Sequence, residues 1–542
     1  MKARLTNSVK NPLLALALGS LALAGCAGLK ALPEKGQYDP SPKVRGGLTG
    51  DESIMNDTVG DESPVPAGKA QATPPVAGAS TIPASYRSLV SHPIPYTPPL
   101  LSSRADTLEN GAEVYWVEDA QLPIASISFL WKEGTLGLSP FEAVTSQVLG
   151  SMLRQGGTKF HDARWIDDTL EVMGADISTG IGSVRSQAAV QGFSRDIPFL
   201  LDLLGEMLTR PAFDTARLSI LKSEMFQAIE HRLDAPAQVL DAAWSQVQYG
   251  PSAWTRRPDS AQVARLTPSH LAERLPERFR ARNCVIAVAG KVDRPLIRQK
   301  LTKLLSGAAS PKLAVLPELP PRHEAGVWLA PVEATQAFVK IGTRFVRRDH
   351  PDYYPLMLAC QALGSGFGTR LVDRIRSDEG LAYHVSAFAG SDYDREALLG
   401  VDLQTKSASA HRAIALVFEE VRKLREAGFK PGELDKARKG LKAALPTLFD
   451  TPEGTAEMFS QSAAWGRKDD HFRTYQKAMD TIPESLVLEV FRKHFKPEEL
   501  RIVVAGPKEA LLATPADGSP ALSSYGPVHL LSKDDLLRSD LK

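Results

Sequence analysis

Hydrophobic and polar residues alternate along residues 105–310 with periods that predict both strands and helices. Residues 123–131 alternate with a period of two, which is typical of a strand with one buried face. Residues 140–154 and 197–208 carry apolar side chains at helical spacing, and the apolar run 285–289 indicates a buried strand. The same reasoning predicts further strands over 112–118, 176–182 and 187–193, and further helices over 163–173, 214–232 and 293–305, with another beginning at Pro268.

The pattern then repeats. Asp234-Ala-Pro236 returns as Asp450-Thr-Pro452, and Val288-Ala-Gly290 returns as Val504-Ala-Gly506, in both cases 216 residues later (236 to 452 and 290 to 506). Several further pairs, Phe279 with Phe495 among them, recur in the same order at nearly the same distance. A period of this length is too long for a solenoid and indicates a tandem duplication of a whole domain.

Each repeat has strands first, then a hairpin, a run of helices and a closing strand. This order predicts an α+β fold in which each of two homologous domains is an antiparallel sheet with helices on one face. Two equivalent domains would enclose a central cleft, which is a common place for a ligand. The expected boundaries are a signal peptide at 1–25, a tether at 26–104, domains at 105–310 and 325–510, a linker at 311–324, and a C-terminal tail at 511–542 whose leucines Leu530, Leu531, Leu536 and Leu537 could dock on the body.

Composition narrows the class of protein. The chain has 542 residues, of which 43% are hydrophobic and 23% charged, and its net charge is +1. This is ordinary globular composition, and it gives no electrostatic case for binding nucleic acid. Three cysteines exclude a disulfide framework, and Cys284 and Cys360 lie in apolar surroundings typical of structural thiols.

The N-terminus has the plan of a secretory signal, because a basic start precedes an apolar run too short to span a bilayer. The run ends in Leu23-Ala24-Gly25-Cys26, which resembles a bacterial lipoprotein cleavage box. The resemblance implies lipid on Cys26 and, because Ala27 rather than Asp follows, an outer-membrane location on the periplasmic face. An ordinary signal peptide with a chance cysteine is the alternative. Residues 27–104 are rich in proline and small residues, which favours a semi-extended tether.

Residues 363–385 carry the candidate chemistry. Gly364, Gly366 and Gly368 open the stretch, a short helical pattern follows, and a strand is predicted from residue 382. Arg376 leaves the helix and Tyr383 enters the strand, so that a fixed cation and a phenol donor can point into one cleft. The alternative is a solvated Arg376 at a helix end and a Tyr383 whose ring fills the core. The glycines lack the strand-loop-helix order and the lysine of a phosphate-binding loop, and we interpret them as a flexible substrate loop.

The duplicated body and the run Arg376-Ser-Asp-Glu-Gly-Leu-Ala-Tyr383 resemble the insulinase or pitrilysin group of zinc proteases, which includes the mitochondrial processing peptidase. The resemblance covers residues 106–508. It implies that Arg376 and Tyr383 hold a peptide near a metal, and that the glycine loop lies at the mouth of the cleft. The signature of the group is an inverted zinc motif, H-x-x-E-H, on the first helix. Here that helix, residues 146–158, contains neither His nor Glu.

No two of the eleven histidines are three to five residues apart, so no helix presents two imidazoles to one metal. We therefore expect this chain to bind no metal or other cofactor, and zinc to lie in a partner subunit. The sequence leaves enzymatic activity of the chain alone uncertain, with a metalloendopeptidase as its class. The resemblance implies a non-catalytic subunit that binds peptide and completes the active site of the partner. The alternatives are a structural or scaffold lipoprotein without proteolytic role and, less favoured, an autonomous zinc protease.

Overall fold

The computed structural model describes residues 96–275, 279, 281–306 and 315–537. The predicted signal peptide, Cys26 and nearly all of the predicted tether lie outside these residues. No helix in the described ranges is both long and apolar enough to cross a bilayer.

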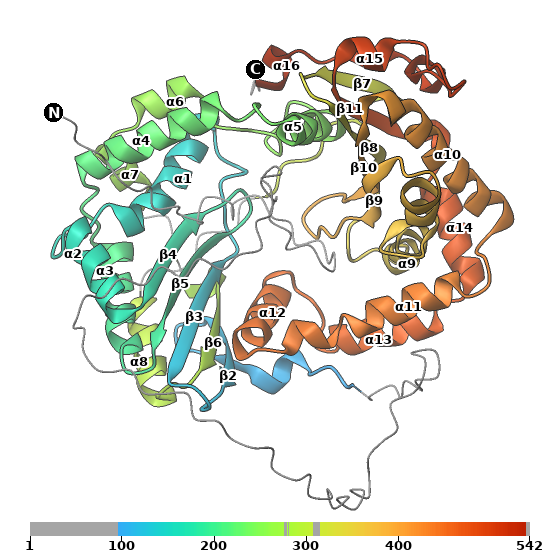
Figure 1. Ribbon diagram of the computed structural model, residues 1–542. Coiled ribbons are helices and arrows are strands. Elements are labelled where there is room, and N and C mark those ends of the chain that lie inside the picture. Colours follow the sequence, from blue (N-terminus) through green and yellow to red (C-terminus); the bar gives the residue numbers. More distant parts are fainter. Residues whose placement is uncertain (1–95, 276–278, 280, 307–314, 538–542) are drawn as a thin grey trace, which may run out of the picture. The chain divides into compact units, whose positions relative to one another are not determined.

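Each repeat forms one six-stranded sheet, coloured blue to green in the first half and yellow to red in the second (Figure 1). The strand orders are β1-β2-β6-β3-β5-β4 and β12-β7-β11-β8-β10-β9, so the inner strands correspond one to one. The tandem duplication predicted from the sequence is therefore visible in the topology, and the α+β class is confirmed.

The strands and helices predicted for the first half agree with the structure to within a few residues, and the structure adds β1, α5 and α6. The elements of this half are β1 (Ala105–Thr107), β2 (Glu113–Glu118), β3 (Ile124–Trp131), α1 (Pro140–Gln155), α2 (Ala163–Met173), β4 (Asp176–Ile181), β5 (Ser186–Phe193), α3 (Ile197–Thr209), α4 (Thr215–Glu230), α5 (Pro236–Tyr249), α6 (Ser260–Arg265), α7 (Pro268–Arg274), β6 (Cys284–Gly290) and α8 (Arg294–Leu304).

The second half follows the same plan and adds a tail. Its elements are β7 (Gly326–Pro331), β8 (Gln336–Arg344), α9 (Tyr353–Gly364), the π-helical segment η6 (Val372–Asp378), β9 (Ala382–Ala389), β10 (Leu398–Lys406), α10 (Ala410–Ala427), α11 (Glu433–Ala443), α12 (Pro452–Ala464), α13 (His471–Thr481), α14 (Glu484–His494), β11 (Arg501–Gly506), α15 (Lys508–Leu512), β12 (Val528–Leu530) and α16 (Lys533–Leu537).

Side-chain caps explain where many helices begin. The carboxylates of Asp162, Asp214 and Asp293 accept the backbone N–H three residues on, at the starts of α2, α4 and α8. The repeated proline motif marks matching starts, since Pro236 and Pro452 occupy the first positions of α5 and α12. The repeated Asp-x-Pro motif thus marks the start of a helix in each half.

The sheets differ from the expected antiparallel form. β2 pairs with β6 in parallel, as β7 does with β11 and with β12, while the remaining pairs are antiparallel. Both sheets are therefore mixed. The parallel pairing follows from the connectivity, because the closing strand of each half returns to the centre of its sheet after the run of helices.

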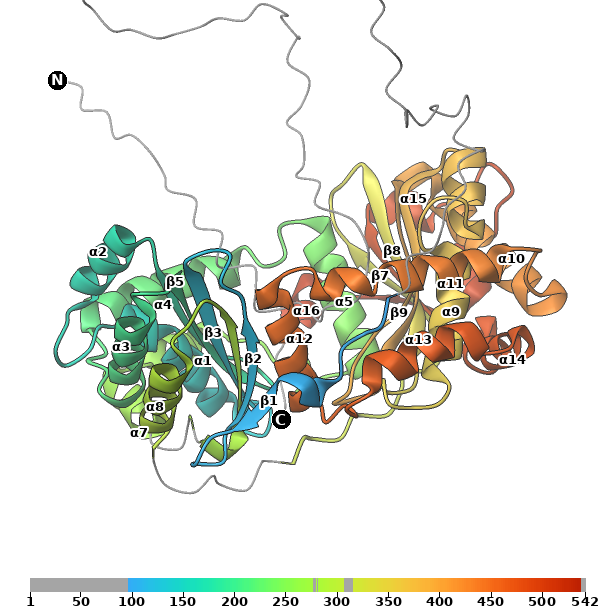
Figure 2. The same ribbon diagram turned by 90° about the horizontal axis from the view of Figure 1, so that it is seen from below.

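The expectation of helices on one face only is also wrong. α12, from the second half, packs against β2, β3 and β6 of the first sheet, and α5, from the first half, packs against β7, β8 and β11 of the second (Figures 1 and 2). We call α5 and α12 the exchanged helices. β6 and β11 are buried at every position, as expected for strands covered on both faces.

The start of the folded body also differs from the expected boundary. The folded body begins before residue 105, because Leu101 is buried and its N–H donates to the carbonyl oxygen of Asp469. The C-terminal tail docks, as predicted, through β12 and through Leu536, which packs on α5. Leu530 takes part only through its backbone, which pairs with Leu329 of β7, because its side chain is exposed. The cleft expected between the halves stays a prediction.

Candidate functional site

The glycine loop begins where α9 meets β9. A Cβ on Gly364 would lie 2.7 Å from the backbone nitrogen of Ala387, so only glycine allows this close approach. The Ser365 hydroxyl donates to the Ala387 carbonyl oxygen at 3.1 Å. The start of the loop is therefore fixed on the edge strand β9.

The loop itself presents an aromatic ring to solvent. Gly366 and Gly368 have φ of 91° and 72°, values that favour glycine, and Phe367 between them is 71% exposed. Lys436 of α11 donates from Nζ to the carbonyl oxygens of Phe367 at 2.6 Å and of Gly368 at 3.2 Å. An exposed phenylalanine held this way is a candidate contact for an apolar ligand.

The π-helical segment η6 carries Arg376, which is half-buried. Val372 and Ile375 are buried, as the helical pattern predicted, and leave Arg376 on the other side. Just before the segment, Arg370 is 3% exposed in its side chain and pairs with Glu433 of α11 at 2.7 Å. This buried ion pair ties the base of the segment to the helix that also holds the glycine loop.

The structure brings Arg376 and Tyr383 together. The Arg376 guanidinium carbon lies 4.9 Å from the ring centroid of Tyr383 and 4.9 Å from that of Phe367. It therefore stacks on both aromatic rings, and within the described part of the chain it forms no ion pair. Tyr383 is 76% exposed, so the alternative of a ring that fills the core is wrong.

A β-bulge explains this exposure. Along the pairing of β9 with β10, Gln404 lies opposite His384 but Thr405 lies opposite Ala382, so Tyr383 is the extra residue. A bulge re-aims side chains, and here both Tyr383 and His384 are exposed. Because β9 is the last strand of its sheet, its outer backbone edge borders this cluster.

Sequence reasoning missed three residues here. Phe367 completes the stack on Arg376, and His384 Nε2 lies 2.6 Å from the Asp402 carboxylate. That hydrogen bond raises the pKa of His384, against the opposing effects of burial and of Arg376. A phenylalanine between two glycines was a signal available in the sequence. The pairing of His384 with Asp402 was not, because it depends on the register of β9 and β10.

One protein-family model matches the part of the chain that contains the candidate site. Residues 265–441 match the family model described as the peptidase M16 inactive domain. This part of the chain is therefore similar to the inactive domain of M16 peptidases. The matched span includes the glycine loop, Arg376 and Tyr383.

Relatives and a solved structure agree. The chain is 22% identical over 341 residues to the uncharacterized zinc protease YmxG of Bacillus subtilis, covering 62% of this chain and 82% of that one. It is 24% identical over 344 residues to the non-peptidase homolog YmxG of Helicobacter pylori, covering 62% and 78%. The crystal structure of a peptidase M16 inactive domain from Pseudomonas fluorescens superposes with a TM-score of 0.64 and 22% identity, covering 74% and 98%.

The side chains on α1 and α4 do not fit a zinc site. On α1, Val148 and Met152 are buried in the core, and Glu142 accepts hydrogen bonds at the helix start from Ser139. The resemblance would place a third zinc ligand, a glutamate, on α4, but the two glutamates of that helix, Glu224 and Glu230, are exposed. Among the described residues no three His, Cys, Asp or Glu side chains form a group that could hold a metal ion.

Neither the glycine loop nor the two described cysteines has the features of a phosphate-binding site or of a reactive thiol. The glycine loop joins a helix to the π-helical segment, which is not the order of a phosphate-binding loop. Cys284 and Cys360 are buried, and burial raises the pKa of both thiols well above the usual value.

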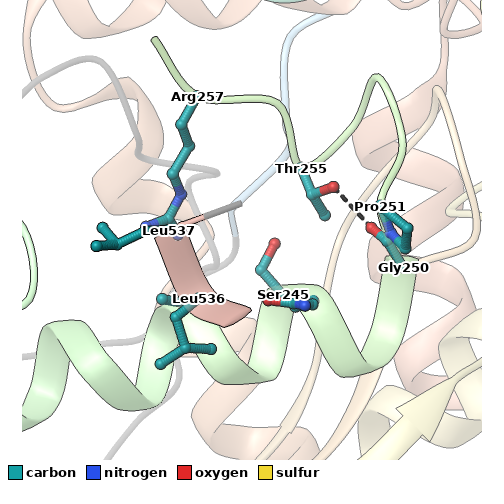
Figure 3. A pocket seen from close by; sticks show the side chains of 9 residues that line it. Ser245, Gly250, Pro251, Thr255, Arg257, Leu536 and Leu537 are labelled. Atoms are coloured by element: carbon teal, nitrogen blue, oxygen red, sulfur yellow. Dashed lines mark hydrogen bonds between the residues drawn. The ribbon is translucent and has the colours of Figure 1, made fainter. Parts of the chain in front are cut away.

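A small cavity lies between α5 and the tail, beside Leu536 and Leu537 (Figure 3), and its volume is only about 20 Å³. It has room for a water or two rather than for a ligand.

Proposed function

We propose that this chain is a non-catalytic subunit of an M16-type zinc protease, and that it binds peptide and completes the active site of a zinc-bearing partner. The observation that carries the proposal is the stack of the half-buried Arg376 on the exposed rings of Phe367 and Tyr383, in a chain whose helix α1 carries no group of metal ligands. A scaffold with no substrate has no need of an arginine that forms no ion pair with any carboxylate in the described residues.

The chain's residues would act by positioning. Tyr383 donates from its hydroxyl to the oxygen on which negative charge develops, and Arg376 donates to backbone carbonyl oxygens of the peptide. The outer edge of β9 offers unpaired backbone groups to an extended peptide, which adds as a further strand. The metal and the general base come from the partner.

Tyr383→Phe is the sharpest test, because it removes the hydroxyl and keeps the ring on which Arg376 stacks. The partner is obtained by affinity purification from the native membrane, and peptide cleavage by the reconstituted pair is measured. We expect turnover to fall by about 10²–10³, as for the loss of one oxyanion donor. Tyr525→Phe, a change in the tail where the ring stacks on Phe418, is the matched control and keeps the full rate.

Two results would contradict the proposal. If no co-purified protein carries H-x-x-E-H, the alternative of a structural lipoprotein is favoured. If Tyr383→Phe cleaves at the wild-type rate, Tyr383 has no part in the reaction.

The proposal includes a location. We expect lipid on Cys26 to anchor the chain on the periplasmic face of an outer membrane, with residues 27–95 as the spacer. Mass spectrometry of the mature N-terminus checks this. An N-terminus other than an acylated Cys26 would remove the anchor from the proposal.

A further inference from the structure

Lys436 of α11 reaches the glycine loop from a separate element of the fold. Its side chain is exposed, and among the described residues no carboxylate forms an ion pair with its ammonium group. The ammonium group donates instead to two successive carbonyl oxygens of the loop, at 2.6 Å for Phe367 and 3.2 Å for Gly368. Hydrogen bonds from a charged donor are stronger than neutral ones, so this contact suits the task of fixing a loop.

The rest of the loop is held by groups close to it in sequence. The Thr369 hydroxyl donates to the Gly366 carbonyl oxygen at 2.6 Å, and the Gly368 N–H donates to the Asp373 carboxylate at 3.1 Å. With Lys436, the carbonyl groups of three consecutive residues, 366 to 368, all have a partner. Lys436 is the member of this set that connects the loop to a different helix.

The backbone at Gly368 leaves room for the ammonium group. A Cβ built on Gly368 would lie only 2.3 Å from Nζ of Lys436, so any side chain at this position would displace the lysine. The φ of 72° already favours glycine. Gly368 therefore serves both the turn of the loop and the approach of Lys436.

The helix that carries Lys436 is itself fixed beside the site. Glu433 lies one helical turn before Lys436, and its carboxylate accepts from Nε of Arg370 at 2.9 Å and from Nη2 at 2.7 Å. Nη2 of Arg370 also donates to the Gly428 carbonyl oxygen at 2.7 Å. Because Arg370 directly precedes the π-helical segment η6, Lys436 acts from a support that is tied to the base of that segment.

The orientation of Arg376 depends on the loop. Its guanidinium stacks on two rings, Tyr383 from β9 and Phe367 from the loop, and forms no ion pair within the described part of the chain. Tyr383 is fixed by the pairing of its strand. The position of Phe367 depends on the loop backbone, which Lys436 holds at the carbonyl group of Phe367 itself.

We propose that Lys436 is a positioning residue. It holds the glycine loop so that Phe367 stays on Arg376, and it thereby preorganises the guanidinium for the carbonyl oxygens of a peptide. Preorganisation raises affinity because less conformational freedom is lost on binding. The functional part of this inference rests on the proposed function, in which Arg376 binds peptide, whereas the effect on Arg376 itself is measured without peptide.

The first experiment reads the stack directly. In full-length chain with ¹⁵N-labelled arginine, the Arg376 Nε–H resonance is assigned by its loss in Arg376→Lys, and its frequency senses the two neighbouring rings. We expect Lys436→Met to move this resonance towards its position in Phe367→Ala. Lys439→Met, at an exposed lysine of the same helix, is the matched control and should leave it in place. An unmoved resonance in Lys436→Met would overturn the proposal.

The second experiment measures affinity. A fluorescein-labelled decapeptide of Leu, Thr and Lys residues is titrated with the full chain, and anisotropy is recorded. We expect Lys436→Met to weaken binding by about three- to tenfold, and Lys436→Arg, which keeps a charged donor, to stay within about twofold of the wild type. Equal binding by Lys436→Met and the wild type would contradict the positioning role.

The two experiments fail separately. No binding of the decapeptide by the wild type would count against the proposed function. A moved Arg376 resonance in the same Lys436→Met sample would still support the assignment of Lys436 to the stack.

A double-mutant cycle tests the route from Lys436 to Arg376. Phe367→Ala removes the ring that Lys436 is proposed to place, so adding Lys436→Met to it should weaken peptide binding by no more than about a further twofold. If the two losses multiply instead, Lys436 acts independently of Phe367 and the proposed route is wrong.

Discussion

Tyr383 and His384 are adjacent in the sequence and exposed on the same edge strand, although a regular strand would point them to opposite faces. The β-bulge at Tyr383 explains why both side chains are exposed, and it lets each of them contact a different charged group. Tyr383 meets the guanidinium of Arg376, while His384 meets the carboxylate of Asp402. The contact of His384 with Asp402 depends on pH, because it stabilises the protonated form of the imidazole.

We expect Asp402→Asn to lower the pKa of His384, because burial and Arg376 then act without the opposing carboxylate. Asp402 raises the folded-state pKa, so the stabilisation by this pair is fully present below about pH 6.5 and is lost as pH rises through the raised pKa. NMR titration of the His384 ring measures the shift.

The stability of the same variant provides the second measurement. The difference between wild type and Asp402→Asn should be larger at pH 6 than at pH 9. Asp480→Asn, which removes an exposed pair with Lys442, is the control and should show no such trend. An unchanged His384 pKa in Asp402→Asn would show that the hydrogen bond has no electrostatic effect.

At this scale the sequence predicted the two residues that stack, Arg376 and Tyr383, because their spacing across a helix break is local information. It did not predict Phe367 as the third member or Asp402 as the partner of His384. Those contacts depend on how a loop of two positive-φ glycines folds back and on where a bulge shifts the register. Neither the fold of the glycine loop nor the position of the bulge can be predicted from the periodicity of hydrophobic residues.

At the scale of elements, the exchanged helices are the feature that the sequence did not predict. α5 and α12 each have an apolar face, but a periodic pattern does not say which sheet that face will cover. Phe459 of α12 is fully buried, with its ring centroid 5.9 Å from that of Tyr115 in the other half. The continuous apolar runs of β6 and β11 were the available signal that both faces of each sheet are covered.

Phe459→Ala should therefore destabilise the chain by about 3–5 kcal/mol, the usual cost of deleting a buried phenylalanine. The loss should reach the first sheet, since that is the surface Phe459 covers. Denaturant unfolding measures the free energy, and hydrogen exchange of β2 and β6 measures its location. Leu122→Ala, at a side chain 61% exposed, is the control and should change stability by less than about 0.5 kcal/mol. Faster exchange confined to β7 and β11 would contradict the assignment.

At the scale of the whole molecule, the duplication and the α+β class were predictable because a repeated order of elements is visible in one chain. Coupling between the halves was not. It comes from the exchanged helices and from contacts such as the two-bond pair of Arg185 with Asp394. The Arg185 pair links residues 209 positions apart, and Gln248 of α5 donates to the Gly342 carbonyl oxygen of β8 across 94 positions. No local pattern specifies such contacts.

This coupling predicts that residues 97–537 unfold in one transition, although chains of this length often unfold domain by domain. Differential scanning calorimetry should give a calorimetric enthalpy equal to the van't Hoff enthalpy. Residues 97–310 alone lack α12, and we expect them to bind a hydrophobic dye and to unfold without cooperativity. Two separate transitions in the full chain, or a cooperative isolated half, would show that the halves are independent.

The exchanged helices also set the order of events during synthesis. The last strand of the first sheet ends at Gly290, and the helix that covers it ends only at Ala464. At translation rates of about 5–20 residues per second, roughly 10–35 seconds separate the synthesis of β6 from that of α12, and the apolar face that α12 covers stays uncovered during this time. A newborn chain of this kind needs a holdase chaperone for the interval, and a stop codon anywhere within it leaves an aggregation-prone fragment rather than a smaller working protein.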